Sequence, residues 1–255
     1  MARTKTNEGG TKTAKTEART LAIDVGGTGL KAAILDAAGQ MATDRAHVET
    51  PDPCPPETLV AALVTLVKPL GTFDRVSVGF PGVVRSGSVV TAPHFGNEIW
   101  QGFPLAPTLS RRLGRPVRLL NDAEVQGLGV IAGRGLEVVL TLGTGVGSAV
   151  FHDGKLTPHL ELAHHPIHKN KTYNEYLGNE ARQSHGRKAW NRRVQRAIGI
   201  VHTLLNYDLL YIGGGNAAHI SVELPDKVRI TSNEAGITGG IRLWDDAVWT
   251  LTGTD

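Results

Sequence analysis

The chain has 255 residues, of which 40% are hydrophobic, and a formal net charge of +3. No run approaches the ~18 uninterrupted apolar residues that a membrane-spanning helix needs, and the N-terminus lacks the apolar centre of a signal peptide. The single cysteine, Cys54, excludes an internal disulfide and a cysteine-based zinc site. We therefore expect a cytoplasmic protein without a membrane partner, long enough for two modest domains.

The excess positive charge lies in the first 19 residues, which hold five basic and two acidic side chains, whereas the remainder is formally neutral. This segment is rich in Thr, Lys and Gly and has almost no large apolar residues, a composition typical of disorder. We predict a disordered basic tail over residues 1–19 without a catalytic role. Because the charge is confined to the tail, it does not indicate a nucleic-acid partner.

Apolar alternation, helical spacing and turn residues predict the elements of the first half of the chain. We expect strands over residues 20–25, 29–35 and 40–48, a helix over 57–68, a strand over 75–80, a hairpin over 83–92, a helix over 105–113 and a strand over 116–120. This last strand ends at Asn121 and Asp122. An isolated Asn-Asp pair is typical of a turn or helix cap, but the carboxyl end of a strand in an open α/β sheet is also where ligands bind.

The second half of the chain repeats the pattern. We expect strands over residues 138–142, 148–151, 208–212 and 228–230, a helical region from about Tyr173, and helices over 190–206 and 233–244. Ser232 or Asn233 is the expected cap of the last helix. Three glycines at positions 236, 239 and 240 weaken that helix, so we predict that it packs closely against another backbone or a ligand.

Two glycine-rich turns between β-rich runs are the most informative feature of the sequence. The first, Gly26-Gly27-Thr28-Gly29, follows Asp24, and the second is Gly143-Thr144-Gly145-Val146-Gly147. Glycine tolerates positive φ and carries no Cβ, so backbone N–H groups in such turns can face a phosphate. The residues after each turn alternate like a strand, which excludes a dinucleotide fingerprint. Tight turning alone is the alternative explanation.

The repetition predicts two lobes that present phosphate-binding hairpins to a shared cleft. We place the N-terminal lobe at residues 20–122 and the C-terminal lobe at residues 123–255, with the final segment packing back on the first lobe. Asp24 would repel a bare phosphate, so its position at the lip of the first hairpin predicts a bound Mg²⁺. Together these features indicate a phosphoryl-transfer site. Outward placement on a strand is the default expectation for Lys31, although its charge near a phosphate hairpin could help to bind the donor; it is left out of the catalytic set.

Seven motifs then follow one another in a single order. They are Asp24-Val-Gly-Gly-Thr28, Gly79-Phe-Pro-Gly82, Trp100-Gln-Gly-Phe-Pro-Leu105, Asn121-Asp122-Ala123, Leu142-Gly-Thr-Gly-Val-Gly147, Glu161-x-x-His164 and Ile212-Gly-Gly-Gly215. Together they resemble the ROK family of sugar kinases over residues 20–243. Within that family the chain is similar to the polyphosphate glucokinase branch. Like that branch, it is short and lacks a cysteine-rich zinc motif after His164, and its residues 190–196, a Trp followed by Arg-Val-Gln-Arg, resemble a segment of that branch.

The resemblance implies a two-lobed, actin-like (ribonuclease-H-like) α/β fold with duplicated βββαβα lobes. It also implies a kinase that uses Mg²⁺ to transfer a phosphoryl group from polyphosphate or ATP to the 6-hydroxyl of glucose, and that can form a homodimer. Asp122 would be the base that takes the proton from the sugar hydroxyl. The expected sugar contacts are Asn97, Asn121, Glu161 and His164. The expected donor contacts are Gly26, Gly27, Thr28, Gly29, Gly143, Thr144, Gly145, Gly147, Gly213, Gly214 and Gly215.

Two residues depart from the family pattern. Ala163 stands where the family has Gly, and His94 stands where it tends to have Asn, so Asn97 is the proposed substitute. These departures leave the hexose open, and a kinase for mannose, fructose or an N-acetylated amino sugar, or a noncatalytic sugar-binding protein, is an alternative. The histidines at 152, 159, 164, 165 and 168 lack a recognised zinc-ligand spacing.

The phosphoryl donor is open as well. Residues 169–196 hold eight basic and two acidic side chains, which can either track a linear polyphosphate or form a solvated helix face. The glycines at 213–215, in contrast, can let a nucleotide approach the backbone, as in ATP-dependent relatives.

Overall fold

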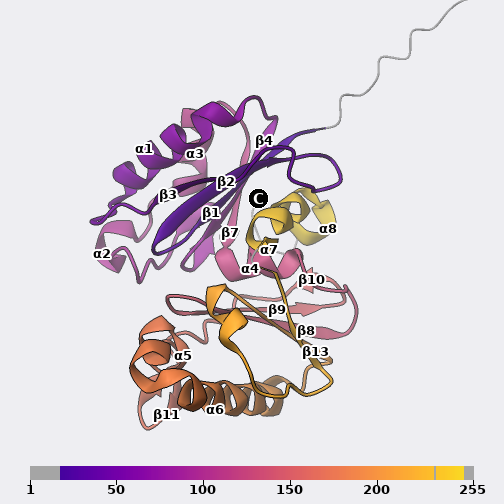
Figure 1. The fold of residues 1–255 in the computed structure, drawn as a ribbon. Helices are drawn as coiled ribbons and strands as arrows, with labels where there is room; N and C mark the ends of the chain where they lie inside the picture. Colours follow the sequence, from indigo (N-terminus) through magenta and orange to yellow (C-terminus); the bar gives the residue numbers. More distant parts are fainter. Residues whose placement is uncertain (1–17, 233, 250–255) are drawn as a thin grey trace, which may run out of the picture.

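The computed structural model describes residues 18–232 and 234–249, which form two lobes stacked end to end (Figure 1). The first lobe is built on a five-stranded sheet in the order β3-β2-β1-β4-β7. Its strands are β1 (Thr20–Val25), β2 (Gly29–Leu35), β3 (Ala46–Glu49), β4 (Arg75–Phe80) and β7 (Val117–Asn121). β1 pairs antiparallel with β2 and parallel with β4, and β4 is parallel to β7.

The second lobe repeats this arrangement. Its sheet has the order β10-β9-β8-β13-β14, formed by β8 (Leu136–Leu142), β9 (Val146–His152), β10 (Lys155–Leu156), β13 (Leu209–Gly213) and β14 (Val228–Ile230). β8 pairs antiparallel with β9 and parallel with β13, just as β1 does with β2 and β4. The expected duplication is therefore confirmed.

Helices cover the first sheet on one face. They are α1 (Pro56–Val67), the 3₁₀ turn η1 (Lys68–Leu70), α2 (Asn97–Trp100) and α3 (Leu105–Leu113), with the small ribbon β5 (Val84–Arg85) and β6 (Ser88–Val89). Inward residues of β1 such as Leu21 and Ile23 pack here with Leu59 and Leu63 of α1. This burial follows from the alternation of the strands and the helical spacing of α1.

The predicted strand over residues 40–48 is shorter in the structure, because β3 begins only at Ala46. The preceding residues form a turn in which the Asp36 carboxylate accepts hydrogen bonds from the N–H groups of Ala38 and Gln40. Such a side-chain cap competes with strand pairing. The remaining strands and helices expected in this lobe lie within two residues of their predicted ends.

In the second lobe the helices lie at the end farthest from the first lobe. They are α5 (Tyr173–Leu177) and α6 (Asn179–Leu205), preceded by β11 (Pro166–His168) and β12 (Lys171–Thr172), and η2 (Gly215–His219) follows β13. α6 is kinked at Gly186, where φ is 73°. Trp190 of α6, fully buried, packs with Tyr173 and Tyr207 against the sheet. Among the helices of residues 18–232 and 234–249, none combines the length and apolar character of a membrane span.

The last described segment packs on the open face of the first sheet. It consists of α7 (Ala235–Thr238), η3 (Gly239–Trp244) and α8 (Asp246–Trp249) instead of one helix over 233–244, and Asn233 lies outside the described residues. Ser77 Oγ of β4 donates to the Gly240 carbonyl at 2.6 Å and accepts from Trp244 Nε1 at 2.9 Å. Figure 1 shows this segment beside the first sheet and above α4 (Asp122–Leu128), which lies between the two sheets.

The glycines of this segment serve the close packing that the sequence predicts. A Cβ on Gly240 would lie 3.2 Å from Ala22 Cβ, and a Cβ on Gly239 would overlap the Val125 carbonyl of α4. The backbones of η3 and α4 therefore touch, which only glycine permits.

Candidate functional site

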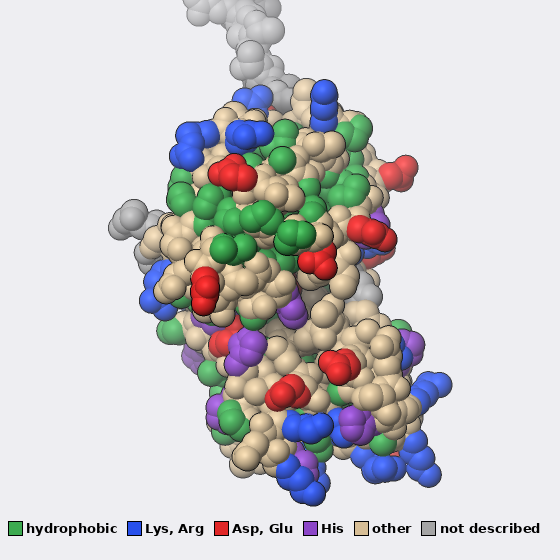
Figure 2. All heavy atoms as spheres, turned by 90° about the vertical axis from the view of Figure 1, so that its left-hand side faces the viewer, with side chains coloured by type: hydrophobic (Ala, Val, Ile, Leu, Met, Phe, Trp, Pro, Cys, Tyr) green, Lys and Arg blue, Asp and Glu red, His purple; other side chains and the backbone are tan. Residues whose placement is uncertain are grey.

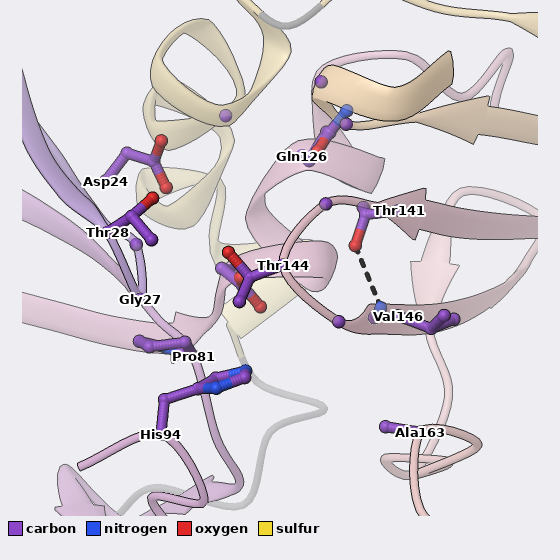
Figure 3. A pocket seen from close by; sticks show the side chains of 18 of the residues that line it. Asp24, Gly27, Thr28, Pro81, His94, Gln126, Thr141, Thr144, Val146 and Ala163 are labelled. Atoms are coloured by element: carbon purple, nitrogen blue, oxygen red, sulfur yellow. Dashed lines mark hydrogen bonds between the residues drawn. The ribbon is translucent and has the colours of Figure 1, made fainter. Parts of the chain in front are cut away.

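A cleft of about 690 Å³ opens between the two lobes. Most residues expected to bind ligands line it, namely Asp24, Gly26, Gly27, Thr28, Gly29, Asn121, Asp122, Gly143, Thr144, Gly145, Gly147, Glu161, His164, Gly214 and Gly215. Figure 3 shows Asp24 and Thr28 of the first lobe facing Thr144 of the second. The fold thus brings both glycine hairpins to one cavity of a size suited to a small-molecule substrate.

The tips of both hairpins present backbone donors. Gly26 N donates to the Gly29 carbonyl at 3.0 Å, and Gly143 N donates to the Gly145 carbonyl at 2.9 Å, so these bonds close the turns. Within residues 18–232 and 234–249, no protein acceptor binds the tip N–H groups, which belong to Gly27, Thr28, Thr144 and Gly145. Free N–H groups aimed at one cavity suit an anion such as phosphate.

The reason for glycine in these hairpins differs from the sequence-based expectation. None of the hairpin glycines has a positive φ. Instead, a Cβ on Gly29 would lie 2.6 Å from His47 Nε2, and a Cβ on Gly147 would lie 2.5 Å from Thr141 Oγ1, which accepts the Gly147 N–H (Figure 3). At Gly29 and Gly147, close approach of neighbouring atoms, and not a left-handed backbone, is what requires glycine, whereas a Cβ on Gly143 would meet no atom within 4 Å.

Asp122 is the first residue of α4 and projects from the floor of the cleft. Its Oδ1 accepts the Ala123 N–H at 2.8 Å. Burial and, next to it, the negative charge of Asp24 raise the pKa of Asp122 to about 7, against the opposing effect of the hydrogen bond from Ala123. A carboxylate with a pKa near neutrality is suited to accept a proton from a hydroxyl group.

Asn121 is the N-cap of α4 and is almost fully engaged by the protein. Its Oδ1 accepts from Ala123 N at 2.9 Å, and its Nδ2 donates to the carbonyls of Phe80 and Gly82. Glu124 completes a capping box by accepting the Asn121 N–H. Asn121 therefore fixes the start of α4, and only a lone pair of Oδ1 remains for a ligand.

Asp24 and Lys31 form an ion pair at the mouth of the first hairpin. They face each other across β1 and β2, and Lys31 Nζ lies 3.0 Å from Asp24 Oδ2. The expectation that Lys31 points away from the site is wrong, since it lines the cleft. Strand register explains this, because directly paired residues project to the same face of the sheet.

The donor set at Asp24 fits the expected Mg²⁺. In phosphoryl-transfer sites this ion is commonly held by one or two carboxylates together with substrate phosphates and water. Asp24 supplies one carboxylate beside the free N–H groups of the first hairpin. In the part of the chain that the structure describes, no cluster of three or more His, Cys, Asp or Glu side chains is arranged to hold a metal ion by itself.

Glu161 is held by a histidine that the sequence analysis did not assign. His159 Nδ1 lies 2.7 Å from Glu124 Oε1, and its Nε2 lies 3.5 Å from Glu161 Oε2. Burial acts to lower the pKa of His159, but the hydrogen bonds to the two carboxylates raise it to about 9. Burial acts to raise the pKa of Glu161, but the bonds from His159 and the Ala163 N–H lower it. Glu161 is thus kept ionised at the cleft.

His94 and Ala163, the two departures from the family pattern, both line the cleft (Figure 3). Burial lowers the pKa of His94, and nearby His164 lowers it further, while Glu161 acts in the opposite direction. His94 is therefore a neutral hydrogen-bonding group at physiological pH.

Two expected site residues do not reach the cleft. Asn97 begins α2, and its Oδ1 accepts the Ala92 N–H at 2.7 Å, so it stabilises the loop that carries His94. Gly213 is buried at the end of β13, where a Cβ would overlap the Gln126 amide. His94, three residues before Asn97, and Gly214, directly after Gly213, line the cleft instead.

The basic side chains of residues 169–196 do not line the cleft. Figure 2 shows Lys and Arg side chains gathered at the end of the second lobe away from the first. Arg187, Lys188 and Arg192 border a separate surface hollow, and Arg193 lies over the Tyr176 ring at 4.6 Å. Arg182 instead donates to Asn179 and Asn216, two amides that do line the cleft.

Several lining residues were not anticipated, namely Lys31, Arg45, His47, Gln126, Thr141, His159, Asn174, Asn179 and Asn216. Asn174 Oδ1 accepts the Val146 N–H at 2.7 Å, and Asn216 Nδ2 donates to the Gly143 carbonyl at 2.9 Å, so both amides shape the second hairpin. The register of Lys31 opposite Asp24 was the one signal in the sequence that could have identified a lining residue.

Comparisons with known proteins agree with this geometry. Residues 20–171 match the model of the ROK family. The chain is 34% identical over 212 residues to the polyphosphate glucokinase of Mycobacterium tuberculosis, covering 79% of each chain. The inorganic polyphosphate/ATP-glucomannokinase of Arthrobacter sp. strain KM superposes with a TM-score of 0.80 and 32% identity, over 88% of this chain and 97% of that one. A ROK family glucokinase from Streptomyces griseus shares the fold, with a TM-score of 0.75, 18% identity and coverage of 88% and 98%.

Proposed function

Because the chain belongs to the ROK family, we propose that it is a glucokinase that transfers a phosphoryl group from inorganic polyphosphate or ATP to the 6-hydroxyl of glucose. The observation that carries this proposal is the position of Asp122, a carboxylate with a raised pKa in a cleft lined by two hairpins with free N–H groups. The similar proteins named polyphosphate glucokinase and polyphosphate/ATP-glucomannokinase support the donor and the sugar.

In this mechanism Asp122 accepts the proton of the 6-hydroxyl as the hydroxyl oxygen forms a bond to the terminal phosphorus of the donor. The bond from that phosphorus to the bridging oxygen breaks at the same time, and the polyphosphate shortened by one unit, or ADP, leaves. Glu161 and His164 hydrogen-bond the sugar from the second lobe, with His94 and Asn121 on the first-lobe side. The free N–H groups of the two hairpins bind donor oxygens, and Gly214 and Gly215 leave room for the rest of the donor. A Mg²⁺ held by Asp24 would neutralise phosphate charge, which is where most catalysis of this reaction lies.

The test is the formation of glucose 6-phosphate by the purified protein with Mg²⁺, using long-chain polyphosphate and ATP in parallel. We expect activity with at least one donor. Calorimetry that detects glucose binding without turnover on either donor would overturn the kinase proposal and favour a noncatalytic sugar-binding protein.

Mannose is the second candidate acceptor. The structural neighbour from Arthrobacter is named a glucomannokinase, and Ala163 and His94 alter the sugar side of the cleft. A hexose panel measures kcat/KM for each sugar, and a higher value for mannose than for glucose would reassign the acceptor.

A homodimer and a cytoplasmic location complete the proposal and can be checked by light scattering and cell fractionation.

A further inference from the structure

A row of charged and polar side chains crosses the first sheet from the proposed reaction site to its open edge. Strand register pairs Asp24 of β1 with Lys31 of β2, and Lys31 with His47 of β3. Paired residues project to the same face, and Arg45, two residues before His47, continues the row. All four side chains line the cleft.

This row begins at the donor hairpin. Lys31 contacts Asp24, and His47 packs against Gly29, the last residue of the first glycine turn. β3 is the edge strand of its sheet, and His47 and Arg45 are exposed. The row therefore runs from the first hairpin to the exposed edge of the sheet.

The charges along the row are unequally neutralised. Lys31 is paired with Asp24 at 3.0 Å. Arg45 forms no ion pair within residues 18–232 and 234–249, although Asp44 precedes it in the chain and Glu49, beyond His47, also lines the cleft. A guanidinium that borders a phosphate site and has no carboxylate partner is available to bind further phosphate oxygens.

The chemistry of the lining favours a phosphate chain over a nucleoside along this row. In the described part of the chain, no Phe, Tyr or Trp lines the cleft, so it offers no large aromatic ring on which a base can stack. A linear polyphosphate instead repeats the same anionic group, and a row of basic side chains is complementary to that repeated negative charge.

We propose that Arg45 and His47, together with Lys31, form the subsite that binds the distal phosphates of a linear polyphosphate donor. This inference rests on the proposed kinase function. It moves the donor track from the basic stretch at 169–196, which lies outside the cleft, to the edge of the first lobe.

The experiment compares Arg45→Gln with Arg187→Gln in the full-length protein. Both variants remove one guanidinium from an exposed position, but Arg187 borders the separate hollow on α6. The readout is kcat/KM with long-chain polyphosphate divided by kcat/KM with ATP, at low and high salt. His47→Gln is measured in the same way.

We expect Arg45→Gln to lower this ratio about tenfold at low salt, mainly through KM for polyphosphate, because one charge-assisted contact is lost. The loss should shrink at high salt and with tripolyphosphate, which is too short to span the row. Arg187→Gln should keep the wild-type ratio. An unchanged ratio in Arg45→Gln, or an equal fall in both variants, overturns the subsite.

The two levels of the proposal are separable in this experiment. Wild-type protein that phosphorylates glucose with polyphosphate supports the proposed function whatever the variants do. Wild-type protein that uses ATP alone overturns the polyphosphate donor and the subsite together, and leaves the sugar kinase standing.

Discussion

The carboxylate of Asp122 owes its chemistry to its surroundings. Burial and the charge of Asp24 hold its pKa near 7, whereas the same residue in an exposed helix would be a far weaker base. Glu161, also in the cleft, stays ionised because His159 and a backbone N–H stabilise its charge. This difference agrees with the roles proposed for the two acids, a proton acceptor at Asp122 and a fixed hydrogen-bond acceptor at Glu161.

Replacing Asp122 by Ala should lower kcat by about 10²-fold or more, because the 6-hydroxyl loses its base, while sugar binding remains measurable. The wild-type kcat/KM should fall as pH drops below about 7, since protonated Asp122 cannot accept a proton. Stopped assays of glucose 6-phosphate and calorimetry with glucose give the two readouts. Substantial turnover in the variant would exclude Asp122 as the base.

His159→Gln should destabilise the protein by about 1–3 kcal/mol at pH 6, because buried Glu124 loses its charged partner. The pKa of His159 is about 9 in the fold against an ordinary 6.5, so its contribution is complete below pH 6.5 and disappears as pH rises through 9. Urea unfolding of both proteins at pH 6 and 9.5 measures this. A difference in unfolding free energy that does not shrink at pH 9.5 would contradict the assignment.

At the scale of elements, α4 is the part of the structure on which the site depends. Its capping box sets the position of Asp122, its side chains pack between the sheets, and its backbone touches η3. Gly129 and Gly239 make this contact possible, since a Cβ on Gly129 would lie 3.0 Å from the Gly239 backbone. The C-terminal segment thus supports the helix that begins with the proposed base.

Gly239→Ala should destabilise the protein by about 1–3 kcal/mol, because the added methyl overlaps the Val125 carbonyl and forces η3 away from α4. Gly199→Ala is the matched control. Gly199 lies in α6 with no atom within 4 Å of the added Cβ, so this variant should gain about 0.5–1 kcal/mol from helix propensity. Thermal and urea unfolding measure the change in unfolding free energy of each variant. Equal changes in Gly239→Ala and Gly199→Ala would refute the packing argument.

At the scale of the whole molecule, the proposed reaction needs both lobes. The hairpin at Gly27 belongs to the first sheet and the hairpin at Thr144 to the second, and both line one cleft. The residues proposed to contact the sugar are divided in the same way, with Asn121 on one side and Glu161 on the other. A ligand that binds both halves draws them together, which excludes water from the phosphoryl donor.

Glucose should therefore reduce the radius of gyration of the protein in small-angle scattering, and the wild-type protein should hydrolyse its donor more slowly than it phosphorylates glucose. Glu161→Gln, which weakens the second-lobe contact to the sugar, should need more glucose to reach the same compaction. A radius of gyration that is unchanged at saturating glucose would show that the cleft is already closed.

The sequence by itself determined the features that rest on local physics. Alternation and helical spacing predict most strands and helices, the two glycine turns predict paired hairpins, and the Asn121-Asp122 pair marks a helix start that lines the cleft. The family assignment follows from the same motifs in the same order and is confirmed by the match over residues 20–171. Each of these signals lies within a few consecutive residues.

Only the tertiary structure decided which side chains share the cleft. The basic run at 169–196 stands out in the sequence yet does not line the cleft, while Lys31 reaches the cleft from β2, and Arg45 and His47 reach it from the start of β3. The same holds for the contact between His159 and Glu124 of α4, which lie 35 residues apart in the chain. Strand pairing and lobe packing set these neighbours, because the face that a residue presents depends on contacts made by segments far away in the chain.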